Sequence, residues 1–99
     1  MRSHDVRRVL DTGRPLRGNR VIVFLAPGTG TVTFVAGRKV GTAVDRNRAR
    51  RILRAAWSEV VRGIGNGYDA VLVAGTAIRG AKTQDLVAEM TELLRGATS

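Results

Sequence analysis

The sequence contains no cysteine, and this absence excludes several kinds of site. Without Cys among its 99 residues, the chain has no disulfide framework, no thiolate metal site and no cysteine nucleophile. Its longest apolar runs are a few residues long, far short of the roughly 20 needed to span a bilayer. Residues 1–5 lack the apolar segment of a secretory signal. We therefore expect a single domain over residues 1–99 that is cytoplasmic, needs no membrane and is stabilised by packing alone.

Acidic residues are scarce, and the resulting positive charge is unevenly placed. The chain has 17 Lys and Arg against 8 Asp and Glu, a formal net charge of +9. Residues 1–67 hold 14 of the basic and 4 of the acidic residues, whereas residues 68–99 hold 3 and 4. Arg outnumbers Lys by 15 to 2, and the planar guanidinium suits bidentate contact with phosphate. These numbers favour a basic face that binds a polyanion.

Residues that could catalyse a reaction are few and scattered. The sole His, His4, lies beside the N-terminus, where it is a poor candidate for a lone general base. The acidic residues Asp5, Asp11, Asp45 and Glu59 are dispersed through separate turns, so no two-metal site is evident. We expect no catalytic residue and no metal site in the protein itself.

Hydrophobic periodicity predicts three helices and three strands. In order, these are a helix over 5–11, strands over 21–26 and 31–36, a helix over 42–62, a strand over 69–74 and a helix over 83–96. The turn Pro27-Gly28-Thr29-Gly30 predicts that the first two strands pair as an antiparallel hairpin. The order α-β-β-α-β-α, with room for one extra short strand, predicts an α+β or α/β two-layer sandwich whose helices cover one sheet.

The helix over 42–62 has two chemically distinct faces. Thr42 and Asp45 begin it as a capping box with Asp in place of the usual Glu or Gln. On a helical wheel with Arg46 at zero, an arc of roughly 0° to 160° holds Arg46, Arg50, Arg54, Asn47, Arg51 and Arg62. The arc of roughly 240° to 340° holds Ala49, Ile52, Leu53, Ala56 and Val60. Arg48 flanks the basic arc, and Arg38 and Lys39 precede the helix.

A polar helix face is usually only solvated, but this one carries charge of one sign. Arg46 with Arg50, and Arg50 with Arg54, are like-charge i, i+4 pairs that each weaken an isolated helix by about 0.2–0.5 kcal/mol. No acidic residue lies between Arg46 and Arg54 to relieve the repulsion. We interpret the face as a polyphosphate-binding surface. RNA is favoured over DNA because no helix-turn-helix spacing or zinc-finger ligand set is visible.

The same segment carries a specific resemblance. Lys39-Val40-Gly41, Ala43-Val44, Arg46-Asn47-Arg48, Arg50-Arg51 and Leu53-Arg54 resemble the signature of the bacterial ribonuclease P protein component family, whose hallmark is an Arg-Asn-Arg helix. Asp5 to Val9 with Gly13, the strand from Tyr68 to Ala74, and the apolar stripe through Leu94 are also similar, so the resemblance covers nearly the whole chain. It implies a ribosomal protein S5 domain 2-like sandwich with a left-handed βαβ crossover.

The resemblance also implies a function. In that family the protein binds a catalytic RNA, and the two together remove the 5′ leader of precursor tRNA as a Mg²⁺-dependent endonuclease. The resemblance implies that the RNA carries the chemistry and the Mg²⁺, that the protein alone is inactive, and that no protein oligomer is required. The alternative from another class is a ribosomal or RNA-chaperone-type protein that binds RNA without a role in cleavage.

The resemblance also implies roles for individual residues. The residues that the resemblance implies contact the catalytic RNA are Arg38, Lys39, Arg46, Asn47, Arg48, Arg50, Arg51 and Arg54. Asn47 has a second interpretation, in which its amide ties down a neighbouring loop. The resemblance further implies a cleft for the single-stranded leader at Val6, Leu10 and Phe24, where aromatic rings of the family stack on bases.

Two departures from the family pattern bear on the leader cleft. Val6 and Leu10 occupy positions where the family often has Phe, and they can pack against bases but cannot stack. By the same resemblance, we expect the family's longer basic N-terminal extension to be shortened here to residues 1–4. Phe24 has the alternative interpretation of a plain core residue. We expect core or rim packing for Phe34, Trp57 and Tyr68, and solvated side chains for Glu89 and Glu92 of the last helix.

Overall fold

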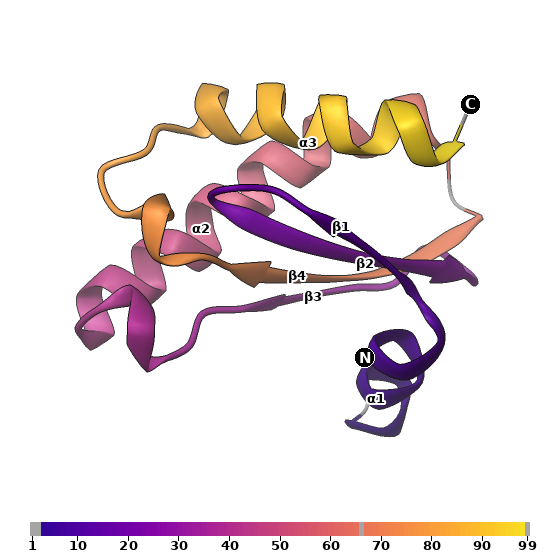
Figure 1. Ribbon diagram of the computed structural model, residues 1–99, viewed down its shortest axis with the longest axis horizontal. Coiled ribbons are helices and arrows are strands. Elements are labelled where there is room, and N and C mark those ends of the chain that lie inside the picture. The colour runs from indigo at the N-terminus through magenta and orange to yellow at the C-terminus, as the bar shows by residue number, and fades with distance from the viewer. Residues whose placement is uncertain (1–2, 66, 99) are drawn as a thin grey trace.

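Among the residues that the structure describes, four strands form one mixed sheet in the order β1-β2-β4-β3 (Figure 1). The computed structural model describes residues 3–65 and 67–98, with side chains for residues 6–65 and 67–97. The strands are β1 Arg14–Arg17, β2 Val21–Pro27, β3 Val32–Val35 and β4 Tyr68–Ala74. The helices are α1 Ser3–Thr12, α2 Ala43–Val60 and α3 Thr83–Thr98, with short 3₁₀ turns η1 Arg38–Val40, η2 Val61–Gly63 and η3 Thr76–Ile78. The α+β class and the predicted element order are confirmed, and β1 is the extra short strand.

The two faces of the sheet are covered differently. Helices α2 and α3 lie together over one face, and α1 lies against the other (Figure 1). The main core is on the α2 and α3 side, where Val23 and Leu72 of the central strands meet Leu53 and Met90. A smaller cluster of Val9, Ala26 and Val71 holds α1 to the opposite face. The main core therefore anchors α2, and the face beside α1 is left partly open.

The predicted hairpin between the strands at 21–26 and 31–36 is wrong. β4 lies between β2 and β3, pairing antiparallel with β2 and parallel with β3. β4 is one of the two inner strands, and its side chains are buried on both faces from Asp69 through Leu72. The parallel β3–β4 pair is connected through α2, which makes α2 a crossover helix. The left-handed sense of this crossover stays a prediction.

The glycine-containing turn between β2 and β3 binds a carboxylate of the chain itself. Asp69 Oδ1 accepts hydrogen bonds from the backbone N–H groups of Thr29 (3.0 Å), Gly30 (3.2 Å) and Thr31 (3.0 Å), and from the Thr31 hydroxyl (2.8 Å). Gly28 is needed beside it, because a Cβ there would collide with the Asp69 carboxylate. The loop can therefore cross the end of β4 without leaving its N–H groups unpaired.

Two expectations for the last helix are wrong. α3 continues to Thr98 and does not end at Gly96, because Gly96 lacks the positive φ of a helix-terminating glycine. Glu89 is not solvated: its side chain is 13% exposed and accepts hydrogen bonds from the backbone N–H groups of Arg20 (2.9 Å) and Val21 (3.2 Å). It thereby ties α3 to the turn between β1 and β2. Glu92 is exposed and pairs with Arg95.

Candidate nucleic-acid interface

The N-terminus of α2 is fixed by the predicted capping box. The Thr42 hydroxyl accepts from the Asp45 N–H (3.3 Å), and Asp45 Oδ2 accepts from the Thr42 N–H (2.9 Å). Gly41, at φ +141°, brings the chain so close to Asp45 that a Cβ would clash with its carboxylate. Hydrogen bonds from the backbone and hydroxyl of Thr42 lower the pKa of Asp45 below its ordinary 3.8. The helix therefore begins at a defined residue and orientation.

The predicted RNA-binding side chains lie on the outer side of α2 and just before it. The core side of the helix is buried through Ala49, Leu53, Ala56, Trp57 and Val60. The side chains that are exposed are Arg38, Lys39, Asn47, Arg48, Arg51 and Arg54, and those that are partly buried are Arg46 and Arg50. The structure thus places all eight predicted positions on α2 and on η1, which directly precedes it.

Two of these arginines are held by neighbouring side chains. The Arg54 guanidinium lies over the Phe34 ring of β3, 5.6 Å from its centroid. Arg50 donates through Nη2 to Asn47 Oδ1, one turn earlier on α2. The hydrogen bond of Asn47 is therefore made within the helix and not to a neighbouring loop. Phe34 packs against the main core, as expected, and the outer face of its ring contacts the Arg54 guanidinium.

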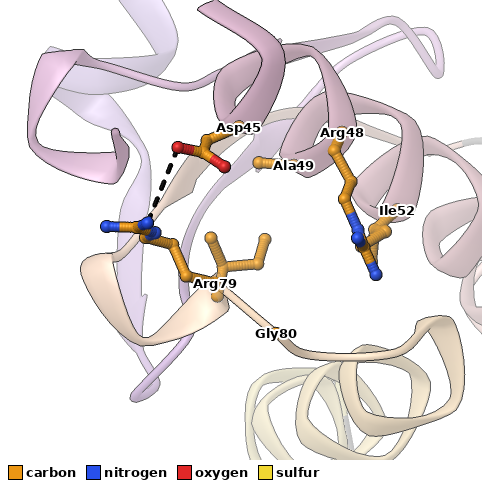
Figure 2. A pocket seen from close by; sticks show the side chains of 7 residues that line it. Asp45, Arg48, Ala49, Ile52, Arg79 and Gly80 are labelled. Atoms are coloured by element: carbon orange, nitrogen blue, oxygen red, sulfur yellow. Dashed lines mark ion pairs between the residues drawn. The ribbon is translucent and has the colours of Figure 1, made fainter. Parts of the chain in front are cut away.

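The predicted RNA-binding cations form no ion pair with the carboxylates that the structure describes. Among the side chains that the structure describes, the ion pairs are Arg8–Asp69, Arg20–Glu89, Arg79–Asp45 and Arg95–Glu92. None of them involves a predicted RNA-binding cation. Asp45 lies on α2 itself, but its carboxylate is engaged by Thr42 and faces Arg79 at 3.7 Å (Figure 2). The surface keeps an uncompensated positive charge that can attract phosphate.

The three predicted leader-cleft residues lie on the other side of the sheet. Val6 and Phe24 pack, partly buried, against the small cluster that attaches α1. Leu10, one helical turn after Val6, is 39% exposed. The structure therefore brings α1 and β2 together as the resemblance implies, and leaves an apolar surface that is accessible at Leu10. Phe24 is partly buried, which is compatible both with stacking on a base and with core packing.

Asp69 and Arg8 connect α1 to β4 next to this surface. Asp69 is 4% exposed, and Arg8 Nη2 donates to its Oδ2. Burial raises the pKa of Asp69, but hydrogen bonds from Thr31, Thr29 and Arg8 outweigh it and lower the pKa from 3.8 to about 2. Sequence reasoning missed this pair, because its partners are far apart in the chain and no local pattern joins them.

Sequence reasoning also missed a concave surface beside α2. A pocket of about 720 Å³ lies between α2 and the start of α3, and Lys82 lines it together with Arg48 and Arg51. A neighbouring pocket of about 340 Å³ is lined by Asp45, Arg48 and Arg79, among others (Figure 2). Arg79 and Lys82 belong to the part of the chain whose net charge is slightly negative, so charge counting gave no reason to place them here.

The described residues offer no evident metal site and no membrane-spanning helix. Within residues 3–65 and 67–98, no three His, Cys, Asp or Glu side chains gather in a way that could hold a metal ion. In the same ranges no helix is both long and apolar enough to cross a membrane. The side chain of His4 lies outside the described residues.

Solved structures of ribonuclease P proteins share this fold. The protein from Staphylococcus aureus superposes with a TM-score of 0.79 at 18% identity, covering 98% of this chain and 92% of that one. The protein from Thermotoga maritima gives 0.80 at 20% identity, covering 97% and 94%. At these identities the likeness establishes the fold.

Sequence relatives establish the family. The Ribonuclease P protein component of Chloroflexus aggregans is 34% identical over 100 residues, which is 97% of this chain and 74% of the relative. That of Acidothermus cellulolyticus is 37% identical over 99 residues, 94% of this chain and 82% of the relative. The family model described as Ribonuclease P matches residues 1–98. The chain therefore belongs to the ribonuclease P protein family.

Proposed function

We propose that this chain is the protein subunit of ribonuclease P and takes part in 5′ maturation of tRNA. It binds the catalytic RNA through α2 and η1, and it receives the 5′ leader of precursor tRNA beside α1. The observation that carries the proposal is the outer face of α2, whose cations form no ion pair with a carboxylate among the described side chains. Membership of the family supports the same partner and substrate.

The geometry of α2 suits a folded RNA. Exposed guanidinium groups can form two parallel hydrogen bonds to a phosphate, and their spacing follows the helix. Arg54 on the Phe34 ring and Arg50 on Asn47 are already oriented, so less side-chain entropy is lost when they bind. Because the main core fixes α2, these groups approach the RNA as one rigid surface. Arg38, Lys39, Arg46, Arg48 and Arg51 extend this surface.

The leader would lie on the open sheet face beside α1. Phe24 offers a ring on which a base can stack, while Val6 and Leu10 add apolar contact. Stacking on an aromatic ring tolerates any base, as a leader of variable sequence requires. Val6 and Leu10 cannot stack, so we expect weaker leader binding than an aromatic residue at either position would give.

The protein contributes binding and orientation in this proposal, and the RNA performs the hydrolysis. The carboxylates Asp45, Asp69, Asp85 and Glu89 are each engaged by backbone or side-chain donors of the fold. These carboxylates stabilise the fold, and among the described residues they do not gather into a shared metal site. The cleavage is Mg²⁺-dependent, with the ions expected on the RNA. No protein oligomer is needed.

Reconstitution of leader cleavage tests the proposal. We expect the protein to increase processing of precursor tRNA by a bacterial ribonuclease P RNA at low Mg²⁺. Replacing Arg46, Arg50 and Arg54 together with Ala should abolish most of this increase, whereas replacing Arg14, Arg17 and Arg95, which lie on β1 and α3, should not. Absence of any stimulation by the wild-type protein would overturn the proposal and favour a ribosomal or RNA-chaperone-type role. Cleavage by the protein alone would contradict the assignment of the chemistry to RNA.

A further inference from the structure

The concave surface beside α2 has the chemistry of a nucleotide site. We call it the α2–α3 groove: the pocket of about 720 Å³ bounded by Val44, Arg48, Arg51, Ile52, Ala55 and Lys82. Its cations come from two segments, since Arg48 and Arg51 belong to α2 and Lys82 to the loop before α3. None of the described residues that line it is acidic. Ile52, Ala55 and Val44 give it an apolar wall, and Val44 is 75% exposed.

The loop that carries Lys82 is held in place by the core. Ile78 and Ala81 are 2% and 5% exposed, and the Ala81 N–H donates to the Ile78 carbonyl (3.0 Å). Gly80, at φ +79°, allows the chain to turn between them. The Lys82 N–H donates to Asp85 Oδ2 (2.9 Å), which fixes the step into α3. Lys82 therefore faces the groove from a defined backbone position, while its side chain is exposed.

The adjoining smaller pocket makes one end of the groove less favourable to anions. Both pockets share Arg48 and Ile52, so they lie side by side along α2. Asp45 lines the smaller one, where Arg79 faces it across 3.7 Å (Figure 2). The smaller pocket is lined by two cations and one carboxylate, whereas the described lining of the α2–α3 groove has three cations and no carboxylate, so a phosphate is attracted more strongly to the end with Arg51 and Lys82. This difference orients a ligand along the groove.

We propose that the α2–α3 groove binds one unpaired nucleotide of the catalytic RNA, an inference that rests on the proposed function. The phosphate lies between Arg51 and Lys82, with Arg48 on the same side. The base lies against Ile52 and Ala55, which requires it to be unstacked from any duplex. A pocket of this size accommodates a small organic ligand such as a nucleotide. The RNA-binding surface thus extends from α2 to the loop with Lys82, which the pattern of the helix does not predict.

The charge contribution is tested by Lys82→Ala, with Arg95→Ala as the matched control. Each removes one positive charge, but Arg95 lies at the opposite end of α3 and does not line the groove. The measurement is the salt dependence of binding to a bacterial ribonuclease P RNA transcribed in vitro, without tRNA. We expect Lys82→Ala to reduce the log–log slope by about 0.7–0.9, as the loss of one phosphate contact does, and Arg95→Ala to leave it unchanged. Equal slopes for the two variants would overturn the phosphate assignment.

The apolar contribution is tested by Ala55→Leu, with Ala88→Leu as the control. Both alanines are exposed helical residues, so the same substitution is tolerated by the fold, and only Ala55 lines the groove. We expect Ala55→Leu to weaken affinity for the catalytic RNA severalfold with little change in salt slope, because it fills the groove without altering charge. Unchanged affinity for Ala55→Leu, at unchanged melting temperature, would overturn the nucleotide site.

Crosslinking locates the nucleotide directly. Because the chain contains no cysteine, Ala55→Cys and Ala88→Cys each create a unique position for a photoreactive group. We expect the group at residue 55 to crosslink to an unpaired nucleotide of the catalytic RNA, and the group at residue 88 to give background only. Crosslinks to paired nucleotides, or to precursor tRNA in place of the catalytic RNA, would overturn the proposal. The proposed function fails separately, if the wild-type protein does not stimulate leader cleavage by the catalytic RNA.

Discussion

At the scale of single residues, Asp69 joins three parts of the fold through its side chain. Its buried carboxylate accepts four hydrogen bonds from the loop between β2 and β3 and one from Arg8 of α1. Hydrogen bonds to a charged acceptor are roughly twice as strong as neutral ones, and removing the acceptor leaves N–H groups unpaired. One side chain therefore joins the central strand, a loop and the helix that borders the proposed leader surface.

The low pKa of Asp69 gives stability that depends on pH. Its folded pKa of about 2 lies below the ordinary 3.8, so its contribution is present above pH 3.8 and is lost as pH falls toward 2. We expect Asp69→Asn to lower the melting temperature near pH 7, and the difference from wild type to shrink between pH 3.8 and 2. Thermal melts by circular dichroism at several pH values measure this. Glu92→Gln, in an exposed pair with Arg95, should have little effect. A difference that is constant with pH would contradict the role of the Asp69 charge.

Two substitutions beside α1 are expected to change leader binding in opposite directions. If bases stack on Phe24, Phe24→Leu should weaken binding of leader-bearing tRNA by about 1–3 kcal/mol and leave mature tRNA unaffected. Leu10→Phe should strengthen leader binding, because Leu10 is 39% exposed and the new ring can reach a base. Affinities of the reconstituted complex for the two tRNA forms provide the measurement. Equal losses for both forms would make Phe24 a packing residue only.

At the scale of elements, α2 carries charge that works against its own stability. Arg50 takes part in two like-charge i, i+4 contacts, with Arg46 and with Arg54. The helix tolerates them because its capping box and its buried face hold it in place. An arrangement that is unfavourable for the helix and favourable for phosphate is expected of a binding surface.

Replacing Arg50 separates stability from binding. We expect Arg50→Gln to leave the free energy of unfolding unchanged or to raise it by up to about 1 kcal/mol, because two repulsive contacts are removed. The same variant should bind the catalytic RNA more weakly. Urea unfolding and a filter-binding assay give the two values. Thr42→Ala should do the opposite, losing about 0.5–2 kcal/mol of stability through the cap. A large loss of stability in Arg50→Gln would show that the face is structural.

The elements also show what could be predicted from the sequence. The extent and capping of α2 were predictable because they depend on local spacing, from Thr42 to the end of the apolar stripe. The position of β4 was not, because neighbours in a sheet are chosen by burial among distant segments. The same limit applies to the α2–α3 groove and to Glu89, whose partners lie on the turn between β1 and β2. The positions of the site residues on α2 could be predicted from the helix pattern. The loop with Lys82, which forms the other side of the groove, could not.

At the scale of the whole molecule, the placement of charge matters more than its total. The net charge of +9 attracts any polyanion, yet many of its cations are concentrated on η1 and α2, within residues 38–54. Removing three arginines from α2 or three from elsewhere changes the net charge equally. The two changes differ only if the RNA contacts a defined face.

Salt dependence distinguishes these cases. For the catalytic RNA, the variant with Arg46, Arg50 and Arg54 replaced by Ala should lose about 0.7–0.9 of log–log slope for each phosphate contact removed. The variant with Arg14, Arg17 and Arg95 replaced by Ala should keep the wild-type slope. Equal slopes for the two variants would mean that binding follows net charge and has no preferred face.

The central position of β4 has a consequence for synthesis. β4 joins β2 to β3, so the ribosome must release residues 68–74 before the sheet can close. Until then β2 has only β1 as a neighbour, and β3 has no strand beside it. Until β4 is released, these two apolar segments lack their partner in the nascent chain and can aggregate.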